Sequence, residues 1–436
     1  MKRYPKYKDS GIEWLGEIPE GWEVIKTQYL LNVSSGNGFP ENLQGIMNGE
    51  YPFFKVSDIN IDSTFIEEAN NYVSKEMVLK NSWKIIPSDS ILLPKIGEAL
   101  KKNHRIINKK DCLIDNNMMA LYPKKLRNIN RYFLYFLLCY VDMEWFVNPG
   151  AVPSVDVKKF KLSYLPLPPE PEQRTIADYL DQKTTKIDEM IKKNERLIEL
   201  LKEKRQAIIS HAVTKGIPPH PPLEKGGWGN LKMKDSGIEW IGEIPEGWEV
   251  KKIKYTSYIK GRVGWHGLRS DEFTDEGTYL VTGTDFIGDK VNWETCYHIS
   301  DERYNQDPYI QLRENDLLIT KDGTIGKVAL VKNLPDRATL NSGIMLIRPI
   351  TKDYCIDFMF WILNSKVFSE YNEYTKTGST IQHLYQETFE NFIFSVPHID
   401  EQKNICAYLT QKTAHIDKTI QKILSQNETL KEYRQA

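Results

Sequence analysis

Lys8–Val24 has the sequence KDSGIEWLGEIPEGWEV, and Lys234–Val250 has the sequence KDSGIEWIGEIPEGWEV, with a single difference between them. A second repeat follows each stretch: Pro166–Ala207 aligns without gaps on Ser395–Ala436, and 20 of the 42 aligned residues are identical. The two offsets, 226 and 229 residues, are nearly equal. Matched segments in the same order and at nearly the same spacing indicate that one whole structural unit is present twice.

The stretches between these repeats have diverged. We call Lys8–Val24 and Lys234–Val250 the frames, and residues 25–165 and 251–394 the inserts. Within each frame a Pro-Glu-Gly triplet predicts a turn, and the tryptophans on both sides of it are typical of residues that anchor a segment to a core. Matched frames around diverged inserts indicate one scaffold that presents two different binding surfaces.

Downstream of each insert, apolar residues recur every seven positions, which is the spacing of a coiled-coil helix. The pattern predicts two helices, each about 60 Å long at ~1.5 Å per residue, that bury their stripes against each other. Met190, Ile191, Leu197 and Ile198 are expected to fill the intervening positions of the first stripe, and Asn194 to set the register. The expected core of the helix pair is Leu180, Ile187, Asn194, Leu201, Leu409, Ile416, Ile423 and Leu430.

The two helices are expected to end differently. The first continues to Gly216, a residue suited to cap a helix C-terminus, and a proline- and glycine-rich linker follows it. The second stops at Ala436, about two turns earlier in the repeat, so we expect it to be truncated relative to the first copy.

The expected fold class is α+β: two α+β recognition domains joined by two long antiparallel coiled-coil helices, with an internal pseudo-twofold repeat. Each insert combines β-rich runs with one aromatic-rich helical stretch, Arg131–Phe146 in the first and Tyr354–Tyr371 in the second. The predicted strands are residues 51–56, 90–93, 279–282, 316–320, 327–331 and 344–348. The expected boundaries are 1–170 for the first domain, 171–215 for the first helix, 216–232 for the linker, 233–398 for the second domain and 399–436 for the second helix.

The composition is that of a globular protein with no strong charge bias. The 436 residues carry a formal net charge of −1, so DNA binding would require positive charge that is concentrated locally or supplied by a partner. The five cysteines form no C-x-x-C pair, so we expect reduced thiols rather than a zinc site or disulfides. The N-terminus lacks an apolar run, and Tyr132–Val141 is about half the length of a membrane span. A cytoplasmic protein without membrane contact is expected.

Basic clusters and polar glycine loops lie at matching places in the two inserts. Lys, Arg, Asn, Gln, Ser, Thr and His side chains are those that contact phosphates and base edges, although ordinary turns contain the same residues. In the first insert the candidate DNA-binding residues are Lys55, Ser57, Lys95, Lys101, Lys102, His104, Arg105 and Ser154. In the second insert they are Lys260, Arg262, His266, Arg269, Thr282, Thr284, Lys321, Thr324, Lys327, Ser379, Gln382 and His383.

Taken together, these features resemble the specificity subunits of Type I restriction–modification systems. The likeness rests on the frames, on L-L-I-T-K-D-G-T-I-G-K at 317–327, on T-G-S-T-I-Q-H at 377–383 and on the P-x-x-x-x-E-Q-x-x-I-A-x-Y-L-D motif of Pro168–Asp181. The first insert departs from the pattern, since it has Pro94-Lys-Ile-Gly-Glu98 where the second has D-G-T-I-G.

The resemblance implies a DNA-recognition subunit without catalytic activity. Each insert would be a target-recognition domain that binds one half of an interrupted, asymmetric double-stranded site, and the helices would dock two methyltransferase subunits. Half-sites on one face of DNA lie about 34–36 Å apart, a distance that helices of about 60 Å can span. The chain itself would need no cofactor or metal. The methyltransferase would use S-adenosylmethionine, and restriction subunits, bound through it, would use ATP and magnesium.

Two other functions would account for parts of the sequence. An enzyme would need catalytic machinery, but the sequence has no glycine-rich cofactor loop, and Gly323–Lys327 is too short for a phosphate-binding loop. Asp316 and Lys321 faintly resemble a nuclease carboxylate–lysine pair, which a strand and its turn also explain. A scaffold or decoy that binds methyltransferase without recognising DNA would explain the helices but not two diverged inserts.

Overall fold

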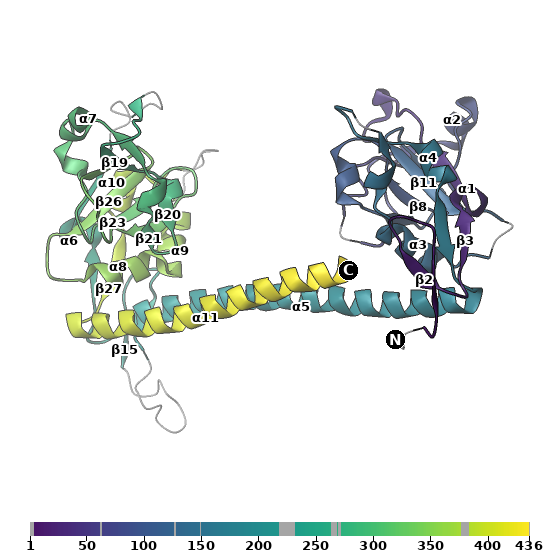
Figure 1. Cartoon of the computed structure of the whole chain (residues 1–436). Helices are drawn as coiled ribbons and strands as arrows, with labels where there is room; N and C mark the ends of the chain where they lie inside the picture. Colours follow the sequence, from purple (N-terminus) through teal and green to yellow (C-terminus); the bar gives the residue numbers. More distant parts are fainter. Residues whose placement is uncertain are drawn as a thin grey trace, which may run out of the picture. The chain divides into compact units, whose positions relative to one another are not determined.

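The computed structural model describes residues 4–61, 63–125, 128–148, 150–217, 232–262, 268, 272–375 and 383–435. It divides into two compact units, Met1–Glu189 and Met190–Ala436, here called unit 1 and unit 2. Figure 1 shows the chain coloured along the sequence. No helix in the described ranges is both long and apolar enough to cross a membrane.

Each frame folds as a short hairpin followed by a strand that closes the insert. The hairpins are β1 (Tyr7–Asp9) with β2 (Glu17–Pro19) and β15 (Met233–Asp235) with β16 (Glu243–Pro245). In unit 1, β3 (Glu23–Lys26) pairs with β14 (Tyr164–Leu167), and Ile25 lies opposite Leu165. In unit 2, β17 (Glu249–Lys252) pairs with β27 (Ile393–Val396), and Lys251 lies opposite Phe394. The first and last residues of each insert are thus partners in one antiparallel ladder.

The inserts have the same sheet order despite their divergence. Unit 1 has a five-stranded sheet of order β4-β11-β8-β9-β6 and a three-stranded sheet of order β10-β5-β7. These strands are β4 (Leu31–Ser35), β5 (Tyr51–Phe54), β6 (Phe65–Ile66), β7 (Tyr72–Val73), β8 (Ile91–Pro94), β9 (Ile106–Asn108), β10 (Leu113–Ile114) and β11 (Met118–Pro123). The short pair β12 (Val147–Asn148) and β13 (Ser154–Val155) completes the unit.

Unit 2 repeats this arrangement with one additional strand. Its sheets have the orders β18-β26-β23-β24-β21-β20 and β22-β19-β25. These strands are β18 (Ser257–Gly261), β19 (Thr278–Val281), β20 (Phe286–Ile287), β21 (Lys290–Val291), β22 (Tyr297–Ile299), β23 (Leu317–Thr320), β24 (Val328–Leu330), β25 (Ala338–Leu340) and β26 (Ile344–Pro349). Each of the six predicted ranges overlaps a strand, namely β5, β8, β19, β23, β24 and β26.

The central strands are buried on both faces, so their side chains alternate between two cores. In β8, Ile91 and Leu93 pack on the face that also contacts α3 (Arg131–Tyr140), while Leu92 packs on the opposite face with Phe54. In β23, Leu317 and Ile319 face α8 (Ile356–Leu363) and Leu318 faces the other core. Because α8 also contacts α11 (Ile399–Gln435), it links this sheet to a long helix (Figure 1).

The helical stretches of the inserts are shorter than expected. The predicted helix Arg131–Phe146 consists of α3 and a 3₁₀ turn at Met143–Phe146, and Tyr354–Tyr371 contains α8 and α9 (Lys366–Tyr374) with a break at Asn364. The remaining short helices are α1 (Thr27–Leu30), α2 (Lys75–Lys80), α4 (Val157–Leu162), α6 (Ile253–Thr256), α7 (Asp301–Asn305) and α10 (Gln386–Phe389).

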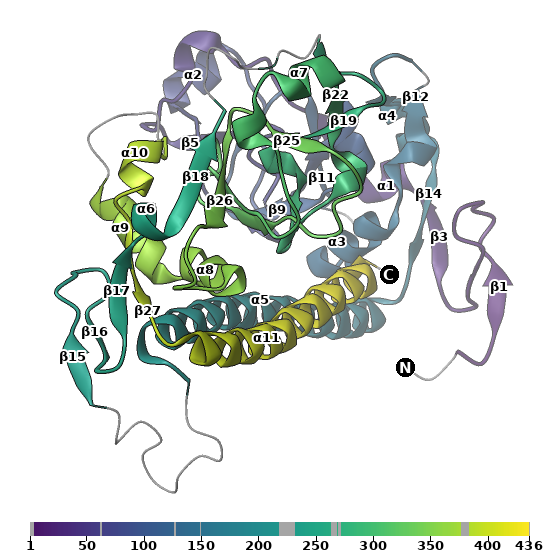
Figure 2. The same ribbon diagram turned by 90° about the vertical axis from the view of Figure 1, so that its left-hand side faces the viewer.

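The two long helices are α5 (Glu170–Lys215) and α11, and within unit 2 they run antiparallel. Asn194 Nδ2 donates to Asn427 Oδ1 at 2.7 Å, and Arg205 Nε donates to Asp417 Oδ1 at 3.0 Å. Residue numbers rise along one helix as they fall along the other, which confirms the predicted orientation. Figure 2 shows the part of α5 from residue 190 on beside α11. Gly216 has a φ of +82° and ends α5, as predicted.

The core of this helix pair differs in part from the predicted stripe. Ile198, Ile416, Ile420 and Ile423 form a buried cluster with Leu201 against it. Met190 and Leu197 were wrongly expected in the stripe, since they are 51% and 44% exposed. Leu409 is buried in the main core of unit 2, with Ile209 and Val213 of α5. Ile187 is also buried, and Leu180 and Leu430 are partly buried.

The Asn194–Asn427 pair leads to a stability prediction. Asn427 is 4% exposed, so Asn194→Leu would leave a buried amide without its partner. We expect a cost of about 1–2 kcal/mol in the free energy of unfolding. The double variant Asn194→Leu/Asn427→Leu should recover this loss, since an apolar pair needs no hydrogen bond. Urea denaturation of the wild type, both single variants and the double variant gives the coupling energy; additive effects would refute the pairing.

One buried glutamine connects the insert of each unit to a long helix. In unit 2, Gln402 accepts from the backbone N–H of Cys355 at 2.9 Å and donates to the carbonyls of Asp353 and Pro397. In unit 1, Gln173 accepts from the N–H of Asn130 and donates to the carbonyl of Pro168, both at 2.9 Å. These are the glutamines of the repeated E-Q motif.

Candidate nucleic-acid interface

The candidate loops gather at one end of the main sheet in each unit. In unit 1 they follow the C-terminal ends of β5 and β8, and in unit 2 those of β19 and β23. Because β8 and β23 are antiparallel to their neighbours, this edge also holds the ends of β4 and β18 and the starts of β11 and β26. Residues far apart in the sequence therefore share one edge.

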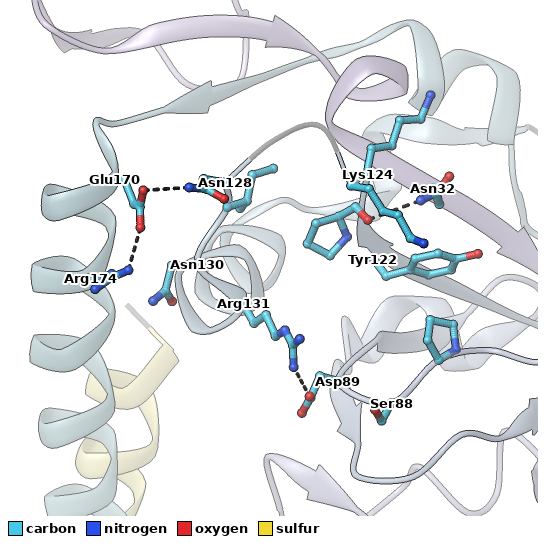
Figure 3. Close-up of a pocket in the computed structure, with 14 residues that line it drawn as sticks. Asn32, Ser88, Asp89, Tyr122, Lys124, Asn128, Asn130, Arg131, Glu170 and Arg174 are labelled. Carbon is cyan, nitrogen blue, oxygen red and sulfur yellow. Dashed lines mark hydrogen bonds and ion pairs between the residues drawn. The ribbon is translucent and has the colours of Figure 1, made fainter.

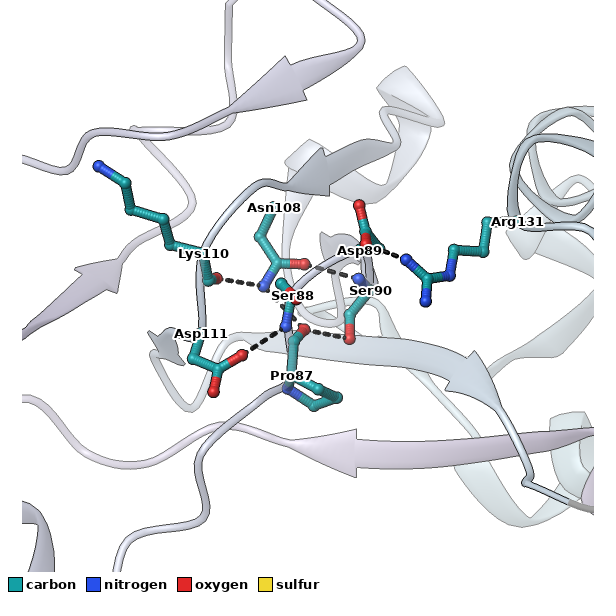
Figure 4. A network of polar contacts seen from close by, with 8 residues as sticks. All are labelled: Pro87, Ser88, Asp89, Ser90, Asn108, Lys110, Asp111 and Arg131. Carbon is teal, nitrogen blue, oxygen red and sulfur yellow. Dashed lines mark hydrogen bonds and ion pairs between the residues drawn. The ribbon is translucent and has the colours of Figure 1, made fainter.

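The opposite end of the unit 1 sheet is fastened by a polar network (Figure 4). Asn108, which is fully buried, donates to the carbonyls of Pro87 and Lys110 and accepts from the N–H of Ser90 at 2.7 Å. Asp89, at a φ of +59°, is ion-paired with Arg131 of α3. The Asn108 bonds hold the turn that precedes β8, and the Asp89–Arg131 pair links this turn to α3. This end of the sheet therefore has a structural role.

A cavity of about 570 Å³ adjoins that network (Figure 3). Its acidic residues already have partners: Glu170 is paired with Arg174 and accepts from Asn128, and Asp89 pairs with Arg131. None of the candidate DNA-binding residues that the structure describes lines this cavity. It lies at the sheet end away from the candidate loops.

In unit 2, the loop after β23 is closed by its own backbone. Thr320 Oγ1 accepts from the N–H of Lys327 at 2.9 Å and donates to the carbonyl of Thr324. This closure leaves Thr324 and Lys327 exposed at the tip. Gly323 and Gly326 have φ values of +68° and +83°, a conformation that favours glycine, which explains the two glycines of the D-G-T-I-G motif.

Lys321 and His383 lie close together beside this loop. The backbone of Lys321 bonds to Gly343 and Leu384, and its Nζ lies 3.5 Å from the carbonyl oxygen of Arg262. His383 Nδ1 lies 2.5 Å from Asp322 Oδ1, with both side chains about 40% exposed. Asp322 was missed as a functional candidate, although it lies within the D-G-T-I-G motif.

A turn of the same construction follows β5 and β19. The N–H of Lys55 donates to Asp58 Oδ2, and the N–H of Thr282 donates to Asp285 Oδ2, each at 2.7 Å. Both carboxylates are buried, so they hold the turns rather than contact a ligand. Ser57 and Thr284 occupy matching positions within these turns, and Thr284 bonds to the Thr282 hydroxyl at 2.7 Å.

The structure brings several first-insert candidates together. Ser57, Lys102 and His104 line one cavity of about 220 Å³, together with Asn60, which the sequence analysis missed. Lys95 and Ser154 lie at the same end of the sheet as this cavity. There, the N–H of Val155 donates to the carbonyl of Lys95 at 2.9 Å. Lys55 lies over the Phe39 ring at 4.0 Å.

Arg105 and Arg262 are corrections, because both guanidinium groups are buried. Arg105 is 4% exposed and donates to the carbonyls of His104, Leu138 and Val141. Arg262 is 2% exposed and donates to the carbonyl of Leu340 at 2.8 Å. Burial lowers the pKa of Arg105 to about 10 and also lowers that of Arg262. Both guanidinium groups are occupied by backbone carbonyls of the core, so neither is exposed for a phosphate contact.

Some of the remaining basic residues are paired with acids. Lys101 lies 2.8 Å from Glu98, and Lys251 lies 2.8 Å from Glu249 and 3.6 Å from Asp353. The Lys101–Glu98 pair is largely exposed and can exchange for a phosphate contact at little cost, whereas Lys251 is only one-third exposed. Lys260 lies in β18 rather than in a loop, near the Tyr309 ring. His266, Arg269, Ser379 and Gln382 lie outside the described residues.

The suggested nuclease pair does not form. Asp316 is 1% exposed, and both of its carboxylate oxygens accept from Arg348, at 2.7 and 2.6 Å. The whole of β23 separates Asp316 from Lys321, so the two residues lie at opposite ends of the strand. Asp316 therefore has a structural role.

Comparison with known proteins gives a consistent picture. The family model described as "Type I restriction modification DNA specificity domain" matches residues 19–200 and 245–426. The MjaVIII specificity subunit of Methanocaldococcus jannaschii is 24% identical over 393 residues, 88% of this chain and 84% of the relative. The EcoBI specificity subunit of Escherichia coli is 21% identical over 410 residues, 94% of this chain and 83% of the relative.

Solved structures share the fold. A chain from a study of complex assembly and conformational transition of the type I R-M system has a TM-score of 0.65 at 16% identity, over 96% of both chains. The crystal structure of the HsdS subunit from Thermoanaerobacter tengcongensis has a TM-score of 0.54 at 16% identity, over 96% of this chain and 95% of that one.

Proposed function

The chain belongs to the Type I restriction–modification DNA specificity family, and we propose that it recognises an interrupted, asymmetric DNA site with one half-site per unit. The observation that carries this proposal is the duplication itself. Two inserts share one sheet order and one closing ladder, yet place different side chains at the same sheet end. Such an arrangement suits two recognition surfaces of different specificity.

The contacts differ in kind between the units. The unit 2 edge offers exposed Thr324 and Lys327 on a closed loop and Lys321 with His383 beside it. The unit 1 edge offers a small cavity with Lys102, His104 and Ser57 around it. Lysines suit phosphates, and hydroxyl, amide and imidazole groups suit base edges. Binding should therefore weaken with salt while remaining sequence-selective.

The proposal extends to partners and cofactors. The long helices would dock two methyltransferase subunits, through which restriction subunits would join the complex. This chain would be non-catalytic and need no cofactor; the methyltransferase would use S-adenosylmethionine, and the restriction subunit ATP and magnesium. Its place would be the cytoplasm, where its DNA substrate is.

The alternative is a scaffold that binds methyltransferase without recognising DNA. Two inserts with one fold but different edge chemistry favour recognition, since a scaffold has no need for this difference. An exchange of one insert that left DNA binding unchanged would support the scaffold.

The test is a methylation map. The chain and its neighbouring methyltransferase are expressed in a methylation-free host, and modified adenines are located by long-read sequencing. We expect one interrupted motif, modified on both strands and absent when this chain is omitted. A methyltransferase that co-purifies with the chain but modifies no motif would refute DNA recognition and favour the scaffold.

A further inference from the structure

The cavity at the recognition edge of unit 1 has an apolar interior. Val56, Ile59, Pro94 and Ala99 line it, and its volume is about 220 Å³. Of these, Ile59 is only 1% exposed. The lining comes from the turn after β5 and the loop after β8, which are the two candidate loops of this unit.

The rim of this cavity is polar and carries hydrogen-bond donors. Lys102 Nζ donates to Asn60 Oδ1 at 3.2 Å. This bond uses one acceptor site of the Asn60 amide oxygen, and the same amide carries an NH₂ group with two N–H donors. The Lys102 ammonium retains two further N–H donors. Both side chains are exposed, so the rim is accessible.

Unit 2 has different chemistry at the matching place. A Cβ on Gly283 would lie 3.0 Å from Thr320 Cγ2, so the two loops approach each other closely there. Thr282 and Thr284 present hydroxyl groups on that turn, 2.7 Å apart. Ser57 and Thr284 thus both place a hydroxyl group on this turn, whereas apolar Val56 of the unit 1 lining has Gly283 as its counterpart.

An apolar cavity beside donors matches one base in the major groove. Thymine places its C5-methyl group next to O4, an acceptor, whereas cytosine presents the N4 amino group, a donor. We propose that the cavity takes the C5-methyl group of a thymine in the first half-site, with O4 accepting from Asn60 or Lys102. The inference rests on the proposed function, because it names a base that unit 1 recognises.

The test uses the unaltered chain, co-purified with its methyltransferase, and duplexes that carry the mapped site. Each thymine of the half-site assigned to unit 1 is replaced singly by deoxyuridine, which lacks only the methyl group. We expect one position at which affinity falls about fourfold, the value of one buried methyl group. At that position 5-methylcytosine, paired with guanine, should bind at least about tenfold more weakly than thymine, because its amino group faces donors.

Variants locate the effect in the cavity. Ala99→Leu fills the cavity and should abolish the preference for thymine over deoxyuridine. Lys80→Leu adds an equally large apolar group on exposed α2 and should retain that preference.

The possible outcomes are distinguishable. A first half-site without thymine, or uniform tolerance of deoxyuridine with site selectivity intact, would overturn the inference and leave the proposed function standing. Equal binding of 5-methylcytosine and thymine would overturn the role of Asn60 and Lys102. Binding without any sequence selectivity would refute the proposed function itself.

Discussion

Exchange of residues 25–165 for the corresponding insert of a relative with a known site is expected to replace one half of the recognised DNA site and leave the other unchanged. The affinity for the original site should fall at least about 100-fold, since each mismatched base pair costs roughly 1–3 kcal/mol. The structural reason is that Ile25 and Leu165 are partners in the ladder between β3 and β14. A foreign insert would therefore be joined to the chain at two neighbouring positions of one ladder. The methylation map described above gives the new site.

The reciprocal exchange of residues 251–394 is the matched control. Lys251 and Phe394 are also partners, so this insert should be replaceable in the same manner and should change the other half-site. A chimera that changes both half-sites would contradict the assignment of one half-site to each unit.

Gln402→Leu is expected to destabilise unit 2 by about 3–4 kcal/mol. The side chain is fully buried and makes three hydrogen bonds, to Cys355 N–H and to the carbonyls of Asp353 and Pro397. Leucine fills similar space but leaves three backbone groups without a partner, each at about 1–3 kcal/mol before relaxation. The midpoint of thermal unfolding should fall by roughly 10 °C.

Two variants serve as controls for this prediction. Gln173→Leu removes two hydrogen bonds at the matching position of unit 1 and should cost less. Gln411→Leu, on an exposed face of α11, should change stability by no more than about 0.5 kcal/mol. Equal stability of the Gln402 and Gln411 variants would show that the buried glutamine does not hold the domain on its helix.

The amino-acid sequence by itself determined the duplicated architecture. The near-identical frames and the heptad stripe are patterns within short windows, and such patterns set local structure. The strands predicted in the inserts were found because buried strands form continuous apolar runs such as Leu317–Ile319. The family resemblance rested on these repeats and on the motifs at 317–327 and 377–383, and the family match at 19–200 and 245–426 confirmed it.

Only the tertiary structure determines which polar residues are buried and which residues they pair with. Arg105 and Arg262 belong to basic stretches in the sequence, but contacts with distant carbonyls bury them. Asn194 could be placed in the stripe, whereas its partner Asn427 could not be identified, because pairing depends on the antiparallel register. The cavity beside Asn60 likewise exists because strand order brings two loops to one sheet end. Burial and pairing arise from contacts between distant segments, which no local pattern encodes.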